Sequence, residues 1–531
     1  MIVNINVGIV GGPGNWGALL DQEGIPNVRA TGVISPEEYS AVVTTDDVDD
    51  RELQRMRMYL SVGGAVLCSA KVYAGLRQTT YNREFVRYIF SDPYSVFANV
   101  GLIDVQKRCR TSWNSNELRT DRNTLAVHVG GHEKGHVIAL PFDVAELMND
   151  NRVETKSFYS PEQRLPFERV SSVSKGALRK LIARSLEILH HRRGIPYAHL
   201  WYYPKNAQTL FAFRVDTEYG GPGEINDLYN LANAHGIPMT WFVNTKSQQL
   251  FLSLFKGMQR QEIGIHCFEH RTYDLEKDNE ANIRQAMRLF ELAGLNAKGM
   301  AAPFGIWNEG LGKALQACGF DYSSEFGYDY DNLPSYPQLD QQPSTVLQIP
   351  VHPITIGSLR RLGYSEEQMK RYLDFVVNQK LSAREPLFFY HHPLDGNHNV
   401  LKHLFEVVKN HNIPETLFHD FAQWWKMRVR AKATFDLTDS TLKVSGAGMD
   451  ESLWVHITRP DGTEAFAPAH DTIGLHQLSW ESRPMTFFLP PNFSRIRNFN
   501  YRIPLTKSID FVTKTVRTIR APAPDKLKSK P

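Results

Sequence analysis

The chain has 531 residues, of which 42% are hydrophobic and 22% are charged, and its formal net charge is +3. This is an ordinary globular composition, and the length favours about three domains of ~150 residues each. The small net charge argues against nucleic acid as a partner, and no apolar run reaches the ~20 residues that a membrane span needs.

The N-terminal segment lacks a basic region and is rich in glycine where a secretory signal would be continuously apolar. The four cysteines have no C-x-x-C spacing, which argues against a disulfide framework and against a cysteine zinc site. They are Cys68, Cys109, Cys267 and Cys318. We therefore expect a soluble, cytoplasmic protein.

Residues 1–148 alternate strand-like apolar runs with helical ones. The expected strands are residues 5–10, 41–45, 63–70, 125–130 and 136–144. This alternation predicts a parallel α/β domain of the flavodoxin-like kind. Gly12 to Gly17 match the pattern G-x-G-x-x-G, but the helix that follows breaks early at Gly24, so a dinucleotide site is disfavoured.

Residues 149–205 are expected to form a connector with one amphipathic helix that closes at Gly194. Residues 206–430 then repeat a strand-then-helix unit, which predicts a β/α barrel. Its expected strands are residues 210–215, 239–243, 262–268, 298–303, 347–351 and 386–392. Residues 431–518 predict a small antiparallel β-sandwich with strands at 440–447, 453–459, 486–490 and 509–519, and residues 519–531 predict a flexible basic tail.

Four candidate metal ligands follow two of the expected barrel strands. Asp216 and Glu218 end one strand, and two carboxylates so close repel each other unless a cation or a proton lies between them. His266 and His270 follow another strand, and on the first turn of a helix both would face one way. Two imidazoles and one carboxylate predict a metal site with open positions, and the second carboxylate is free to act as a base.

Two further strand ends carry polar features. A Pro-aromatic-Gly turn at residues 303–305 can point the backbone N–H of Phe304 into a cleft, where it would stabilise an oxyanion. His391 and His392 close the last expected strand, immediately before Pro393. Because side chains alternate along a strand, only one of these two histidines is expected to face a site, where it could protonate a leaving amine.

On these motifs, residues 206–430 resemble the polysaccharide deacetylase family, the NodB-homology domain of carbohydrate esterase family four. The order is that of the family: a D-x-E acidic motif, H-x-x-x-H, a turn similar to R-P-P-Y-G, and a late strand that ends in histidine. Residues 418–428 also resemble the family's closing helix. The resemblance implies a distorted, incomplete β/α barrel that removes N-acetyl groups from a polysaccharide, oligosaccharide or glycolipid.

The resemblance also implies a divalent metal, with zinc expected first and cobalt, manganese, nickel or iron as alternatives. The side chains that would bind it are Glu218, His266 and His270. Asp216 would be the base, His392 the acid, and the backbone N–H of Phe304 would help to hold the oxyanion. The implied partner is an acetylated carbohydrate.

The sequence departs from the family pattern at two places. Ala301 stands where the family has the arginine that steadies the catalytic aspartate, and the D-W motif is not recognisable, which leaves Asp321 and Glu325 as candidates by neighbourhood. A degenerate protein that binds carbohydrate or acts as a scaffold is therefore one alternative. Hydrolysis of another non-peptide C–N bond is a second, and an Fe(II) oxygenase is a third, disfavoured because it would need an antiparallel fold.

The N-terminal domain resembles the class I glutamine amidotransferase-like fold in its order of elements. A nucleophile elbow would need G-x-C-x-G, whereas Cys68 lies in the run VLCSA. We expect Cys68 to be a buried structural cysteine and the domain to be non-catalytic.

Overall fold

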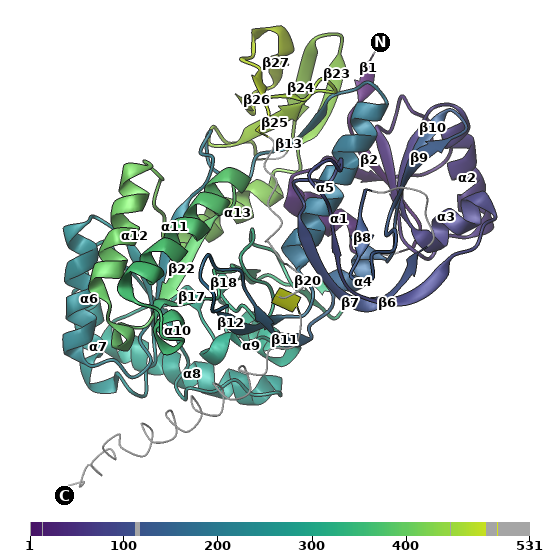
Figure 1. The fold of residues 1–531 in the computed structure, drawn as a ribbon. Coiled ribbons are helices and arrows are strands. Elements are labelled where there is room, and N and C mark those ends of the chain that lie inside the picture. Colours follow the sequence, from purple (N-terminus) through teal and green to yellow (C-terminus); the bar gives the residue numbers. More distant parts are fainter. Residues whose placement is uncertain (1, 13, 112–116, 447, 485–495, 498–531) are drawn as a thin grey trace, which may run out of the picture.

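The structure, a computed structural model, describes residues 2–12, 14–111, 117–446, 448–484 and 496–497. Three bodies are visible in Figure 1: a barrel-like domain, an N-terminal α/β domain beside it, and a pair of small antiparallel sheets against which the N-terminus lies. Within the described residues, no helix is both long and apolar enough to cross a bilayer.

The N-terminal domain is built on a six-stranded sheet in the order β3-β2-β4-β5-β10-β9. All its strands are parallel except the edge strand β9. The strands are β2 (Val7–Val10), β3 (Asn27–Arg29), β4 (Ala41–Thr44), β5 (Ala65–Ser69), β9 (His128–His132) and β10 (Gly135–Leu140). The helices that accompany them are α1 (Trp16–Glu23), α2 (Asp50–Ser61), α3 (Ala70–Arg77) and α4 (Val144–Met148).

The long helix α5 (Lys175–Arg192) packs on this sheet and does not serve only as a connector. Its apolar stripe lies in the same core cluster as strand residues such as Val43 and Leu67. Two features of this region were not expected. One is a three-stranded antiparallel sheet of β6 (Asn82–Phe90), β7 (Leu102–Thr111) and β8 (Arg119–Thr120), and the other is a hairpin of β11 (Val153–Ser157) and β12 (Phe167–Ser171).

The barrel-like domain carries a seven-stranded parallel sheet in the order β21-β18-β17-β16-β15-β14-β22. Its strands are β14 (Phe211–Asp216), β15 (Met239–Val243), β16 (Glu262–Ile265), β17 (Gly299–Met300), β18 (Tyr322–Ser323), β21 (Leu347–Gln348) and β22 (Leu387–His391). The outer helices are α6 (Pro222–Ala234), α7 (Leu252–Lys256), α8 (Glu276–Ala293), α9 (Glu309–Ala317), α10 (Ile356–Arg361), α11 (Glu366–Ala383) and α12 (His398–Asn410). A two-stranded sheet of β19 (Gln338–Leu339) and β20 (Gln342–Pro343) lies beside them.

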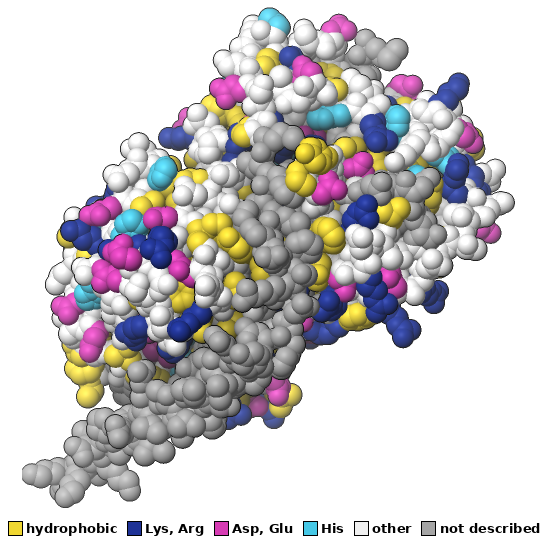
Figure 2. Space-filling view, in the orientation of Figure 1, with side chains coloured by type: hydrophobic (Ala, Val, Ile, Leu, Met, Phe, Trp, Pro, Cys, Tyr) yellow, Lys and Arg dark blue, Asp and Glu magenta, His cyan; other side chains and the backbone are white. Residues whose placement is uncertain are grey.

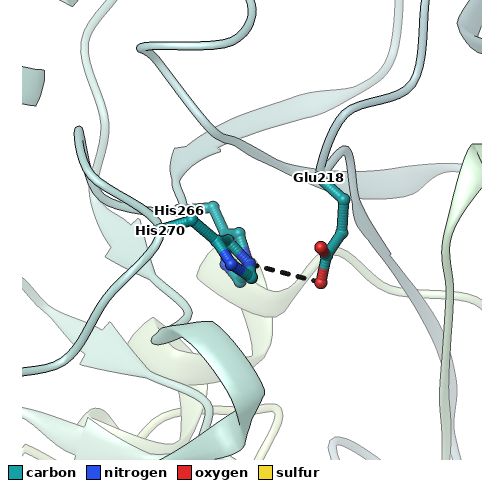
Figure 3. A group of neighbouring side chains, drawn as sticks. All are labelled: Glu218, His266 and His270. Carbon is teal, nitrogen blue, oxygen red and sulfur yellow. Dashed lines mark hydrogen bonds and ion pairs between the residues drawn. The ribbon is translucent and has the colours of Figure 1, made fainter. Parts of the chain in front are cut away.

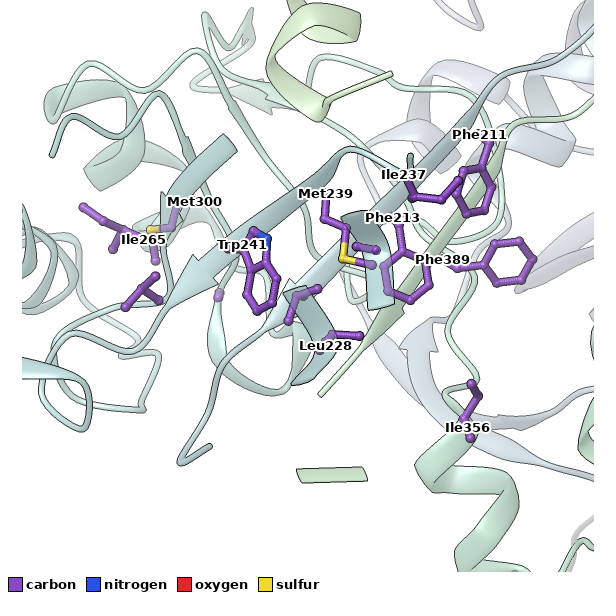
Figure 4. Close-up of a cluster of buried hydrophobic side chains, with 14 of the residues drawn as sticks. Phe211, Phe213, Leu228, Ile237, Met239, Trp241, Ile265, Met300, Ile356 and Phe389 are labelled. Carbon is purple, nitrogen blue, oxygen red and sulfur yellow. The ribbon is translucent and has the colours of Figure 1, made fainter. Parts of the chain in front are cut away.

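Alternation along the strands separates two cores. On β14, Phe211 and Phe213 join the cluster between the sheet and the outer helices, which also holds Trp241 and Met300 (Figure 4). The neighbouring side chains face the interior, where residues of β14, β15, β18, β21 and β22 pack around helix α13 (Phe418–Arg430). A sheet that wraps one cluster in this way is an open, incomplete β/α barrel, so the expected fold class is confirmed.

Two four-stranded antiparallel sheets enclose a further core. One contains β23 (Thr434–Thr438), β24 (Thr441–Ser445), β27 (Thr472–Gly474) and the N-terminal strand β1 (Ile2–Asn4). The other contains β25 (Trp454–Thr458), β26 (Thr463–Pro468), β28 (Glu481–Ser482) and β13 (Tyr197–Leu200). The sandwich therefore draws strands from the start of the chain and from the connector. The strands expected at 486–490 and 509–519 lie outside the described residues.

One buried arginine joins the three bodies. Arg428 on α13 donates from Nε to the carbonyl of Trp201 at 2.7 Å, from Nη1 to that of Gln22 at 2.8 Å and from Nη2 to that of Leu200 at 2.8 Å. Since unmade hydrogen bonds of a buried guanidinium are costly, these contacts fix how the bodies pack.

Candidate metal centre

Glu218, His266 and His270 lie together at the carboxyl edge of the barrel sheet (Figure 3). One ligating atom of each residue lies within 4.8 Å of the others, and this is the one such group among the described residues. The Nε2 atoms of the two histidines are 3.1 Å apart, and Nε2 of His270 lies 3.3 Å from Oε1 of Glu218. Ligand atoms held about 2.0–2.1 Å from a tetrahedral zinc are separated by about 3.4 Å, so the spacing suits a small divalent ion.

The tautomer of His266 also fits a cation. Its Nδ1 lies 2.7 Å from the carbonyl oxygen of Ala301, which can only accept a hydrogen bond, so the proton is on Nδ1 and the lone pair of Nε2 faces the other two side chains. Burial lowers the pKa of His266 to about 4, which keeps the ring neutral. A neutral imidazole aimed at a second imidazole and a carboxylate is a donor set for a metal.

The backbone around these ligands differs from the expected one. The strand ends at Asp216, and Glu218 adopts a φ of 49° in the segment that follows it. His266 and His270 are not on a helix: Cys267 adopts a φ of 62°, and the next helix, α8, begins only at Glu276. Left-handed backbone at non-glycine residues is strained, and here it occurs at the ligand Glu218 and at Cys267, beside the ligand His266.

Asp216 is buried and forms a bidentate ion pair with Arg214, two residues earlier on β14. Nε of Arg214 donates to Oδ1 and Nη2 donates to Oδ2, each at 2.6 Å. Burial by itself favours the neutral acid, but the guanidinium outweighs it and lowers the pKa of Asp216. The carboxylate thus stays ionised beside the metal ligands, as a base must.

His392 faces the site and His391 does not. Nε2 of His392 lies 3.7 Å from Oε1 of Glu218, and its Nδ1 lies 2.9 Å from Oδ2 of Asp395. Burial works against its charged form, but the hydrogen bond to Asp395 prevails and raises the pKa of His392. His391 is buried on the other face of the strand, near Phe213, and burial lowers its pKa to about 4.

The turn at Pro303–Gly305 is a short 3-10 helix beside the ligands. Phe304, a residue that is 47% exposed, adopts a φ of 58°, and its ring packs edge-on against His270 with centroids 4.8 Å apart. The ring of Tyr219, 52% exposed, lies 5.7 Å from His270. Two half-exposed aromatic rings therefore flank the ligand group.

The two acids expected by neighbourhood lie elsewhere. Asp321 immediately precedes β18, and its Oδ1 lies 3.7 Å from Nζ of Lys426 on α13. Glu325 is buried in the barrel interior, where it accepts from the backbone N–H of Ala302 at 2.8 Å and from the side chain of Gln348. Burial raises the pKa of Glu325.

Reasoning from the sequence missed Arg214 and Asp395, the partners of Asp216 and His392. A signal for each was present. An arginine inside the apolar run FAFRVD, two residues before the aspartate, lies on the same face of the strand. In HHPLD, an aspartate follows the second histidine by three residues.

The sequence matches no protein-family model and no curated protein. Among solved structures, part of the chain is similar to a probable polysaccharide deacetylase from Pseudomonas aeruginosa PAO1 (17% identity, TM-score 0.36, 41% of this chain and 91% of that chain). It is likewise similar to PuuE allantoinase (18% identity, TM-score 0.37, 42% and 92%). A third similar structure is a carbohydrate esterase family 4 pseudoenzyme from Bacillus anthracis (11% identity, TM-score 0.30, 41% and 68%).

Proposed function

We propose that this chain is a metal-dependent hydrolase that removes N-acetyl groups from a carbohydrate. The observation that carries the proposal is the convergence of Glu218, His266 and His270, with a neutral His266 whose lone pair faces the other two. An ionised Asp216 and a histidine with a raised pKa, His392, stand beside them. A base and an acid next to a metal site are the groups that amide hydrolysis requires.

Each group of the site has one part in the reaction. Glu218, His266 and His270 would hold a divalent ion, which would supply Lewis-acid chemistry. Asp216 accepts the proton of the attacking water, and the backbone N–H of Phe304 stabilises the oxyanion. His392 then donates a proton from Nε2 to the departing amine, while its Nδ1 stays hydrogen-bonded to Asp395. Acetate and a free amino sugar result.

A carbohydrate suits the surroundings of the site. The exposed rings of Tyr219 and Phe304 flank His270 and offer apolar faces to a sugar ring. On the face seen in Figure 2, acidic and basic side chains are intermixed over the outer helices, which does not favour a polyanionic partner.

Acetate release tests the proposal. The full chain, loaded with zinc, cobalt or manganese, is incubated with N-acetylated oligosaccharides, an O-acetylated polysaccharide and a cyclic ureide. We expect acetate from an N-acetylated sugar, and loss of the activity when a chelator removes the metal. Turnover of the ureide alone would replace the proposal with hydrolysis of another C–N bond. Tight sugar binding without any product would support the degenerate, carbohydrate-binding alternative.

A further inference from the structure

Each of the two proton-handling residues has a charged partner on its own segment of the chain. Arg214 precedes Asp216 by two residues on β14, and Asp395 follows His392 by three residues in the short 3-10 helix η3 (Pro393–Asp395). We propose that Arg214 and Asp395 are positioning residues that hold Asp216 and His392 in the orientation for proton transfer. This inference rests on the proposed function.

Arg214 is held from every side. It is 0% exposed, its Nη1 donates to the carbonyl and the hydroxyl of Ser324, and its guanidinium lies 5.4 Å and 5.3 Å from the ring centroids of Phe242 and Tyr390. A guanidinium fixed by these contacts presents its Nε–H and one N–H of Nη2 in one direction. The bidentate pair therefore fixes both the position and the tilt of the Asp216 carboxylate.

The small side chain of Ala301 is consistent with this placement. Ala301 belongs to the same interior cluster as Phe242 and Tyr390, the two rings that border the guanidinium. Its methyl group leaves the middle of the barrel to the long side chain that enters from β14. Arg214 thus supplies to Asp216 the positive charge that an arginine at position 301 would supply.

Asp395 is also held in place by its surroundings. It is 7% exposed, and its backbone carbonyl accepts from Nη1 of Arg360 at 2.6 Å and from Asn397 at 2.7 Å. A Cβ atom on Gly357 of helix α10 would lie 2.1 Å from Oδ2 of Asp395, so only glycine leaves room for the carboxylate. From this position the carboxylate binds Nδ1 of His392, which leaves Nε2 to face the site.

Arg214→Met tests the first half of the inference, because methionine fills part of the space but cannot bind the carboxylate. The readouts are a crystal structure of the full chain, metal content, and kcat and KM for acetate release. We expect Asp216 to leave its present position and kcat to fall about 10²-fold, with KM and metal content unchanged. Arg214→Lys should recover part of kcat.

Arg384→Met is the control for the loss of a bidentate arginine–carboxylate pair, here a partly buried one. Arg384 binds Glu464 through Nη1 at 3.0 Å and Nη2 at 2.6 Å, away from the metal ligands. Its variant should melt earlier and keep kcat. An Arg214→Met protein whose Asp216 has not moved, or whose kcat is within about threefold of wild type, would overturn the assignment of Arg214.

Gly357→Ala tests the second half, since the added methyl group displaces the Asp395 carboxylate without altering Asp395 itself. Gly357→Ala and Asp395→Asn, made as separate variants, should each lower kcat about tenfold to 10²-fold at unchanged KM and metal content. Gly223→Ala is the control: Gly223 lies on α6 of the same domain, and a Cβ there meets no atom within 4 Å. The assignment of Asp395 is wrong if displacement of its carboxylate leaves kcat unchanged.

The structural readout separates this inference from the proposed function. If Asp216 moves in Arg214→Met, and His392 moves in Asp395→Asn, the partners hold these side chains whatever the reaction is. A wild type that releases no acetate from any sugar would then count against the proposed function alone. Unmoved side chains in an active enzyme would count against the positioning alone.

Discussion

The carboxyl edges of the two parallel sheets differ in how their polar groups are used. At the edge of the N-terminal sheet, Asp46 accepts from the hydroxyl of Ser69, lies 3.4 Å from Nη1 of Arg110, and its backbone carbonyl accepts from Lys71. These groups bind one another. At the edge of the barrel sheet, Arg214 binds Asp216. The ligating atoms of Glu218, His266 and His270 are left close to one another.

A parallel sheet supplies a place for a site but does not determine its chemistry. Both edges gather acids and bases at strand ends. The barrel edge alone, within the described residues, places three ligating side chains close enough to hold an ion. Cys68, on β5, is buried and burial raises the pKa of its thiol, as expected of a structural cysteine.

Removal of a histidine should have the largest effect on metal binding and acetate release at the barrel edge, and no such effect at the edge of the N-terminal sheet. His266→Ala is expected to lose the bound ion and to reduce acetate release to background, because the ligand with the fixed tautomer is gone. His128→Ala makes the same change in the N-terminal sheet, where His128 lies 3.0 Å from the hydroxyl of Tyr73. It should affect melting temperature only. Metal analysis and acetate assay of both variants decide this.

Neutralising an aspartate should come next. Asp216→Asn keeps the shape of the side chain but cannot take a proton, so we expect kcat to fall by about 10²- to 10⁴-fold while the metal is retained. Asp46→Asn at the other edge should leave kcat within about twofold. Loss of metal from Asp216→Asn would mean that Asp216 is itself a ligand and would contradict its assignment as the base.

Moving the arginine should have an intermediate effect. Ala301→Arg, introduced into Arg214→Ala, returns a guanidinium to the barrel interior from the residue that follows β17. We expect kcat to rise about tenfold above that of Arg214→Ala, measured by acetate release at saturating sugar. No recovery, in a protein that folds and binds metal, would show that only the approach from β14 orients Asp216.

The smallest effect should be on stability at the N-terminal edge. Burial raises the pKa of Asp143, and the charge of Asp46 adds to this. Between the unfolded pKa and the raised folded pKa, the folded state binds more protons than the unfolded state, so the contribution of Asp143 to stability is lost as pH rises through its raised pKa. Asp143→Asn should raise the free energy of unfolding at pH 7 by a few tenths of a kcal/mol, since Asn also caps helix α4. Urea melts at pH 4 and pH 7 measure the difference, which should be smaller at pH 4.

Much of the fold could be predicted from local patterns. Alternating strands and helices predicted both parallel sheets, because a buried parallel strand is a short continuous apolar run. The pairing of β1 with β23 and of β13 with β25 could not be predicted, because it joins segments far apart in the sequence. The hairpin of β6 and β7 was also missed.

The site, like the fold, was predictable where local sequence patterns determine it and not where contacts between distant segments do. Strand ends and the D-x-E and H-x-x-x-H spacings predicted that His266 and His270 would meet one of the two acids, and the family resemblance implied that this acid is Glu218. The structure brings Glu218 together with the two histidines. The helical placement of the two histidines was wrong, because the φ of 62° at Cys267 turns the chain before any helix forms. Such a backbone angle is stabilised by tertiary contacts, so it cannot be predicted from local residue propensities.

Metal content is the most direct test of the central claim. Full-length protein purified without chelator, and His270→Ala beside it, are analysed by mass spectrometry for bound metal. His411→Ala, a change at an exposed histidine of the same domain, is the control. The account predicts about one equivalent of a divalent metal in the wild type and in the control, and none in His270→Ala. A wild type that stays metal-free after incubation with zinc, cobalt and manganese would contradict it.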